Sequence, residues 1–271
     1  MAKVLVVTSG KGGVGKTTST AALGASLAQN GEKVVVVDFD VGLRNLDLVM
    51  GAERRVVFDL INVVQGVAKL SQALIRDKRL ENLWLLPASQ TRDKDALTDE
   101  GVGSIIADLR TRFDWIICDS PAGIERGATL AMRYADEAVI VTNPEVSSVR
   151  DSDRIIGMLD SKTVKAEKGE QVKKHVLITR YDTARAARGE MLTIEDILEI
   201  LATPLLGIIP ESQDVLRASN VGSPVTLNNA ASAPARAYAD AARRLMGETV
   251  TMRVPTERKG LMDRLLGRRA A

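Results

Sequence analysis

The sequence has few of the residues on which several kinds of protein site depend. Its 271 residues include one cysteine, Cys118, and one histidine, His175. A single cysteine can form neither a disulfide within the chain nor a metal site built from several thiolates. A lone histidine likewise leaves no histidine cluster for a metal or a catalytic triad. We therefore assign no function to His175 and expect Cys118, which lies inside an apolar run, to belong to the core.

Charge of one sign and long apolar runs are also lacking. Lysine and arginine total 37 and aspartate and glutamate total 35, so there is no overall basic field of the kind that binds nucleic acid. No apolar run reaches the roughly 18 residues of a membrane helix, and the run at 4–7 is too short for a signal peptide. With 45% hydrophobic residues, the composition is globular, and we expect a soluble cytoplasmic protein with no nucleic-acid partner.

Short apolar runs alternate with helical patterns along the chain. The runs are rich in valine, isoleucine and leucine with little alternation, as expected for strands covered on both faces. We predict strands at 4–8, 33–38, 83–87, 115–119, 137–142, 175–179 and 205–209. We predict helices at 18–30, 101–111, 147–161, 194–201 and 233–246, with Gly31 ending the first. This order predicts an α/β fold, a doubly wound and mostly parallel sheet with helices on both faces.

A glycine-rich segment directly follows the first predicted strand. Residues 10–17 read Gly-Lys-Gly-Gly-Val-Gly-Lys-Thr and match the G-x-x-x-x-G-K-[ST] pattern of phosphate loops. Glycines let backbone N–H groups turn toward phosphate oxygens. Lys16 supplies a charge to the β- and γ-phosphates, the Thr17 hydroxyl is a ligand for Mg²⁺, and the following helix adds its N-terminal dipole. We predict that ATP with Mg²⁺ is bound by Gly10, Lys11, Gly12, Gly13, Val14, Gly15, Lys16, Thr17 and Thr18.

Three aspartates stand where predicted strands end. Asp38 and Asp40 are two residues apart, so both can face the ligand crevice at the carboxyl edge of the sheet. Asp119 ends the apolar run 115–118, which is the layout of a Walker B strand. We expect Asp38 and Asp119 to hold Mg²⁺ through water and Asp40 to orient the attacking water. A turn that simply favours aspartate is the alternative for Asp38.

Three further positions are candidates for the nucleotide. Gly123 follows the Asp119 strand and can offer its backbone N–H to the γ-phosphate. Arg180 and Pro210 stand at the ends of the last two predicted strands, where a doubly wound fold places the base of a nucleotide. They are our candidates for contact with adenine.

A second lysine stands at the mouth of the loop. With Lys11, the segment 10–17 resembles the deviant Walker A signature of the ParA/MinD family of P-loop ATPases. In that family the first lysine reaches across a nucleotide-sandwich dimer to the partner's ATP. The resemblance implies an ATP-dependent homodimer in which Lys11 acts in trans. The candidate catalytic residues are then Lys11, Lys16 and Asp40. A solvated loop lysine is the alternative.

Other segments extend the resemblance over nearly the whole chain. They are 38–47, 85–97, 119–125, 142–154, 215–220 and 259–267. These blocks are similar to the members of the family that place the bacterial division septum. The resemblance implies an ATP-switched ATPase that dimerises on the cytoplasmic face of the inner membrane and recruits the division inhibitor MinC. Hydrolysis, stimulated by MinE, would release it.

The helix predicted after the sixth strand is similar to the family's partner-binding face. It covers residues 147–154, with Asp151 and Asp153 as the candidate partner contacts. A solvated acidic start of a helix is the alternative.

The end of the chain combines apolar and basic residues. On a helix, Leu261, Met262, Leu265 and Leu266 share one face, and residues 257–271 carry a net charge of +3. So short a helix is unstable alone in water, whereas an anionic bilayer can bury its apolar face beside its basic residues. We predict an ATPase domain at 1–247, a linker at 248–257 and a membrane-targeting segment at 258–271. A helix docked on its own domain, or a disordered stub, is the alternative.

Other branches of the family are alternative functions. A ParA-type DNA-segregation ATPase needs a basic DNA-binding face or an added DNA-binding module, and here the first strand is predicted at residue 4. A flagellar-number regulator would differ only in its partners. A redox ATPase similar to the nitrogenase iron protein needs two cysteines per chain, and this chain has one.

Overall fold

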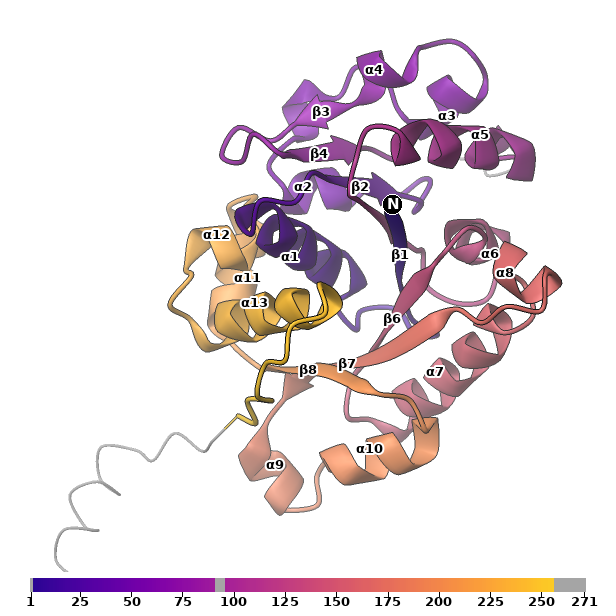
Figure 1. Ribbon diagram of the computed structural model, residues 1–271. Helices are drawn as coiled ribbons and strands as arrows, with labels where there is room; N and C mark the ends of the chain where they lie inside the picture. Colours follow the sequence, from indigo (N-terminus) through magenta and orange to yellow (C-terminus); the bar gives the residue numbers. More distant parts are fainter. Residues whose placement is uncertain (1, 91–95, 256–271) are drawn as a thin grey trace, which may run out of the picture.

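One eight-stranded sheet organises the part of the chain that the computed structural model describes, residues 2–90 and 96–255 (Figure 1). The strand order is β3-β4-β2-β5-β1-β6-β7-β8, and every neighbouring pair is parallel except β3 with β4. The strands are β1 Lys3–Thr8, β2 Val34–Asp38, β3 Ile75–Arg76, β4 Leu83–Leu86, β5 Trp115–Asp119, β6 Glu137–Thr142, β7 Lys173–Tyr181 and β8 Leu205–Pro210. The predicted doubly wound α/β fold is confirmed.

Helices cover both faces of this sheet (Figure 1). They are α1 Lys16–Gln29, α2 Leu46–Val49, α3 Leu60–Val64, α4 Leu70–Ala73, α5 Asp99–Arg110, α6 Arg126–Met132, α7 Val146–Leu159, α8 Val164–Glu167, α9 Thr183–Ala187, α10 Ile194–Leu201, α11 Gln213–Asn220, α12 Val225–Asn228 and α13 Ala233–Leu245, with a 3-10 turn at Glu53–Arg55. Along β1, Leu5 and Val7 pack with α1 and α13, whereas Val4 and Val6 pack with α5 and α6. Successive strand residues thus meet opposite layers, which explains why the strands read as continuous apolar runs.

Among the differences between the fold and the sequence prediction, two concern strands at or near the edges of the sheet. The strand β3 was not predicted, because it consists of two residues at an antiparallel edge. The strand β7 runs two residues further at each end than the predicted 175–179.

Gly31 follows α1 with φ +93°, as a residue that ends a helix in the left-handed region does. In the ranges 2–90 and 96–255, no helix is long and apolar enough to span a bilayer.

The membrane-targeting prediction at 258–271 lies outside the described residues, as does the part of the block 85–97 between 91 and 95. The predicted linker is described as far as residue 255. Its residues Val250 and Thr251 accept hydrogen bonds from Arg244 on α13, so this part of the linker contacts the domain.

Candidate nucleotide site

The glycine-rich loop lies between β1 and α1, at the carboxyl edge of the sheet. Gly13 and Gly15 have φ of +76° and +97°, a region that side chains with a Cβ rarely adopt. Gly10 is required for a different reason, because a Cβ there would come within 2.3 Å of the carbonyl oxygen of Asp151 on α7. The sequence therefore places glycine where the loop turns and where it presses against α7.

The Thr179 side chain holds the loop in place from a distant strand, and Asn143 in turn contacts Thr179. The Thr179 hydroxyl on β7 donates to the Val14 carbonyl at 2.7 Å and lies 2.8 Å from Oδ1 of Asn143. All three residues are buried. Sequence reasoning missed Thr179 and Asn143, because the contact of Thr179 with the loop, and that of Asn143 with Thr179, depend on the order of the strands.

Lys16 begins α1 with its side chain turned into the protein. It is 8% exposed, and its ammonium group donates to the Ser9 hydroxyl at 3.0 Å and to the Lys11 carbonyl at 3.5 Å. Burial lowers the pKa of Lys16, against the attraction of Asp119 and Asp40. Within the described ranges no carboxylate lies at ion-pair distance from it. A buried cation with only neutral partners is suited to an anionic ligand.

Two buried carboxylates lie close together on neighbouring strands, and one of them, Asp119, attracts this lysine. Asp38 ends β2 directly opposite Asp119, which ends β5, and both are at most 1% exposed. Burial, and then Asp119, raise the pKa of Asp38 well above its usual value. Burial also raises the pKa of Asp119 to about 7, against hydrogen bonds from Thr17 and Thr20 and the attraction of Lys16. Two close carboxylates with raised pKa values are suited to a cation.

The remaining catalytic and metal candidates lie around this pair. The Asp40 backbone N–H donates to Oδ1 of Asp38 at 2.8 Å, and the Asp40 carboxylate acts electrostatically on both Lys16 and Asp119. The Thr17 side chain hydrogen-bonds to Asp119. Thr18 is half-buried in the same first turn of α1. The structure thus brings the predicted Lys16, Thr17, Asp38, Asp40 and Asp119 together.

Thr20 is a further member of the site that sequence reasoning missed. Its hydroxyl donates to Oδ1 of Asp119 at 3.0 Å, and it is fully buried. Its position three residues after Thr17 on α1 is the signal that could have found it, because residues three apart share a helix face.

Lys11 lies at the mouth of the loop and contacts the start of α7. Its ammonium group donates to Oε2 of Glu145 at 2.7 Å and to the Ser147 hydroxyl at 3.1 Å. The hydrogen bond from Lys11 lowers the pKa of Glu145. Both charged side chains are partly exposed, at 38% and 55%, so this ion pair stabilises the fold little and can exchange for another partner. The role of Lys11 in trans stays a prediction.

The other candidates lie at the same edge of the sheet. The Gly123 N–H donates to the Ser9 carbonyl at 3.3 Å, so it reaches a phosphate only if this bond opens. Arg180 is exposed with φ +53° at the end of β7, and Pro210 stands beside Tyr181 in the register of β7 and β8. Their adjacency fits the predicted adenine position and does not test it.

The two partner-face candidates lie on the outer part of α7. Asp151 is half-buried where α7 meets Gly10, and its carboxylate lies 3.8 Å from Arg154. Asp153 is exposed. The helix predicted to bind the partner therefore lies against the phosphate loop at Gly10.

Comparison with known proteins agrees with this geometry. Residues 5–225 match the family of CobQ/CobB/MinD/ParA nucleotide binding domains. The chain is 62% identical over 270 residues to the septum site-determining protein MinD of Escherichia coli K12, covering 98% of this chain and 100% of that protein.

Two solved structures add information on ligands and partners. One is the MinC:MinD cell division protein complex of Aquifex aeolicus, with TM-score 0.84 and 43% identity over 93% of this chain and 99% of that one. The other is the septum site-determining protein MinD of Pyrococcus horikoshii complexed with Mg-ADP, with TM-score 0.79 and 32% identity over 90% of this chain and 96% of that one.

Proposed function

The chain belongs to the CobQ/CobB/MinD/ParA nucleotide-binding family, and from that premise we propose that it is an ATP-switched ATPase that determines the position of the division septum. The observation that carries this proposal is the buried lysine of the loop, without a carboxylate at ion-pair distance in the described chain, near a pair of buried carboxylates of which Asp119 attracts it. Such a pairing suits a polyphosphate that carries its own divalent cation.

The residues present fit ATP with Mg²⁺. The loop from Gly10 to Gly15 supplies backbone N–H groups to the phosphates, and Lys16 neutralises charge on the β- and γ-oxygens. Thr17 and Asp119 are placed to hold the metal, with Asp38 supporting its water ligands. Mg²⁺, when bound, neutralises charge that develops during phosphoryl transfer. Asp40, which lies near Asp38, Asp119 and Lys16, would orient the attacking water.

Dimerisation with ATP is the second part of the proposal. Three large apolar side chains are exposed in the segments that follow the sheet at its carboxyl edge: Leu43 (68%), Ile124 (56%) and Val146 (53%). They lie in the loops after β2 and β5 and at the start of α7, beside the segment that holds Lys11. An apolar rim around a nucleotide is suited to a second copy of the chain, in which Lys11 would leave Glu145 for the partner's phosphates.

Partners and location complete the proposal. The relative solved with MinC supports a division inhibitor as partner. Asp151 and Asp153 on α7 are our candidates for its docking face. We extend this to MinE as the stimulator of hydrolysis. The residues 258–271 would attach the dimer peripherally to anionic phospholipid on the cytoplasmic face of the inner membrane.

Sedimentation with vesicles tests the function directly. The full chain is incubated with Mg²⁺ and either ATP or ADP, with anionic or neutral vesicles, and with duplex DNA in a parallel series. Cosedimentation with anionic vesicles in ATP alone supports the proposal. ATP-dependent binding to DNA instead would favour a ParA-type DNA-segregation ATPase, and equal vesicle binding in ADP would contradict the switch.

A further inference from the structure

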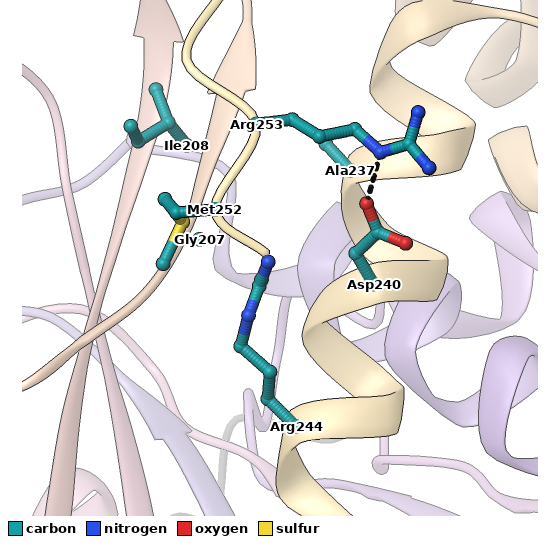
Figure 2. Close-up of a pocket in the computed structure, with 7 residues that line it drawn as sticks. All are labelled: Gly207, Ile208, Ala237, Asp240, Arg244, Met252 and Arg253. Atoms are coloured by element: carbon teal, nitrogen blue, oxygen red, sulfur yellow. Dashed lines mark hydrogen bonds and ion pairs between the residues drawn. The ribbon is translucent and has the colours of Figure 1, made fainter. Parts of the chain in front are cut away.

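The chain does not leave the domain where its last helix ends. After α13, residues 248–254, which we call the return segment, fold back beside α13 and the edge strand β8 (Figure 2). Figure 1 shows the same course, with the yellow end of the chain passing close to β8. The sequence predicts a linker here, because the segment lacks a helical or strand pattern.

One guanidinium group ties the return segment to the sheet. Arg244 donates to the Val250 carbonyl at 3.0 Å and to the Thr251 carbonyl at 2.8 Å, and its third bond reaches the Leu206 carbonyl on β8 at 2.7 Å. The rigid fork of an arginine suits such a set of acceptors better than a lysine would. The bond to Leu206 also occupies a carbonyl on an edge strand, where backbone groups would otherwise be open.

An ion pair and an apolar contact add to this attachment. Asp240 on α13 is 6% exposed, and its carboxylate accepts a hydrogen bond from Arg253 at 2.5 Å. Between Arg253 and Thr251, Met252 packs against the apolar cluster of β7, β8 and α10. Figure 2 shows Met252 beside Ile208 on one side of the segment and Arg253 directed toward Asp240 on the other.

We propose that the return segment is a fixed mooring for the membrane tail, with Arg244, Asp240 and Arg253 as its positioning residues. This inference rests on the proposed membrane attachment and adds the way in which the domain holds its anchor. With the segment docked, its last attached side chain is that of Arg253, so residues 254–257 lie between this attachment and residue 258. With it released, the last attachment is the bond from the Glu248 N–H to the Arg243 carbonyl, so residues 249–257 lie between.

The length of free chain matters because the second tail of a dimer inserts intramolecularly. Its effective concentration at the membrane falls roughly as the −3/2 power of the tether length. Lengthening each tether from four residues to nine should therefore weaken attachment of the dimer about threefold. The docked segment also fixes the point at which the chain leaves the domain, just after Arg253.

The test uses the full chain with ATP, Mg²⁺ and vesicles of phosphatidylcholine and phosphatidylglycerol, and measures the lipid concentration at half-maximal binding. Arg244→Ala/Arg253→Ala removes the bonds to Val250 and Thr251 and the ion pair with Asp240, and should raise this midpoint about threefold. Insertion of five Gly/Ser residues after Val254 keeps the mooring but gives the same free length, and should raise it equally. Arg253→Lys, which can still pair with Asp240, should stay near the wild type.

Arg236→Ala is the matched control, because Arg236 is exposed on the same helix and its bond goes to Ala231 outside the return segment. Hydrogen exchange of the amides at 249–254 should speed up in the double variant alone. Unchanged midpoints in the double variant and the insertion variant, with the wild type bound, would overturn the mooring while leaving the proposed function intact. An equal shift of the midpoint in Arg236→Ala would also overturn the mooring, because the loss of positive charge would then explain the shift. Absence of wild-type binding in ATP would refute the proposed function, and the mooring with it.

Discussion

Asp38 lies directly opposite Asp119 in the parallel register of β2 and β5, and both carboxyl groups are buried. Neighbouring strands bring together two side chains that are 81 residues apart in the sequence. Their proximity raises the pKa of Asp38 beyond the effect of burial. The pair is therefore an unfavourable arrangement in the free protein that a divalent cation would relieve.

Lys16→Ala should weaken nucleotide binding by about 100-fold or more, because hydrogen bonds to a charged group contribute roughly 1.5–3 kcal/mol each and Lys16 is the buried cation of the loop. Isothermal calorimetry with Mg·ADP and Mg·ATP measures the effect. Lys33→Ala is the matched control, since Lys33 precedes β2 at the opposite edge of the sheet, over the Trp84 ring. Micromolar affinity in the Lys16 variant would show that the phosphate-loop assignment is wrong.

Lys11→Ala should leave ATP binding by the monomer near the wild-type value and prevent both the ATP-dependent dimer and hydrolysis. In the structure Lys11 is bound to Glu145 and Ser147 rather than to the loop's own interior, so its loss does not alter the phosphate cradle. Analytical ultracentrifugation with ATP measures the dimer. Glu145→Gln is the informative companion, because it removes the ion pair but keeps the lysine. A normal dimer in the Lys11 variant would rule out the role in trans.

Asp40→Ala should bind ATP and dimerise but fail to turn over, because the residue is proposed to position water rather than to hold the phosphates. The expected complex stays on vesicles after a limited amount of ATP, whereas the wild type is released once it has hydrolysed that ATP. A phosphate-release assay at saturating ATP measures turnover. If the variant hydrolyses ATP at the wild-type rate, Asp40 has no part in the reaction.

The sequence predicts best the features that depend on neighbours along the chain. Seven strands are recognisable because burial on both faces makes them uninterrupted apolar runs. The phosphate loop is recognisable because its glycines and lysines are contiguous. The short helices α2, α3 and α4 have only four or five residues, too few for a full amphipathic repeat. Hydrophobic periodicity therefore does not predict them.

Contacts that depend on the order of strands were not predictable from one sequence. The Thr179 hydroxyl donates to the Val14 carbonyl, although the two residues are 165 apart in the sequence. No local pattern distinguishes Thr179 from other strand threonines. The same holds for Tyr238 on α13, whose hydroxyl lies 3.0 Å from that of Ser19 on α1. Both contacts brace the nucleotide loop or its helix, and each arises only when the sheet brings β7 and α13 to their places.

Leu265→Glu should release the protein from anionic vesicles and leave ATP binding and dimerisation unchanged. Fully burying a large aliphatic side chain contributes roughly 1.5–3 kcal/mol, and basic residues near an anionic surface add about 1 kcal/mol each. Ordering a short helix opposes this by about 1–2 kcal/mol per residue. One tail should therefore bind weakly and two tails on a dimer about 10²–10⁴ times more strongly. Cosedimentation of the variant in ATP at the wild-type level would contradict the membrane-targeting proposal.

The Asp119 carboxyl should make nucleotide binding and stability depend on pH in opposite directions. Its pKa in the folded chain is about 7, raised from 3.8 by burial. The folded state therefore holds this proton more tightly than the unfolded state between about pH 4 and pH 7, and the free energy of unfolding of the nucleotide-free protein falls as pH rises through that window. A metal ligand must be ionised, so the affinity for Mg·ADP should instead rise over the upper part of the window and level off above about pH 7.

Asp119→Asn should flatten both pH dependences. A smaller pH dependence should remain from Asp38, because the two carboxyls titrate as a pair. The variant should melt higher than the wild type without nucleotide at about pH 7.5, where the wild type carries the buried charge. Thermal melts and Mg·ADP titrations from about pH 5.5 to 8 measure the two effects. Glu137, whose pKa is lowered to about 2 from 4.5 chiefly by His175 and Lys3 against its burial, contributes stability that is lost only as pH falls below about 4.5, outside this range. Parallel pH profiles for the variant and the wild type would show that Asp119 is ionised throughout and that its burial does not control metal binding.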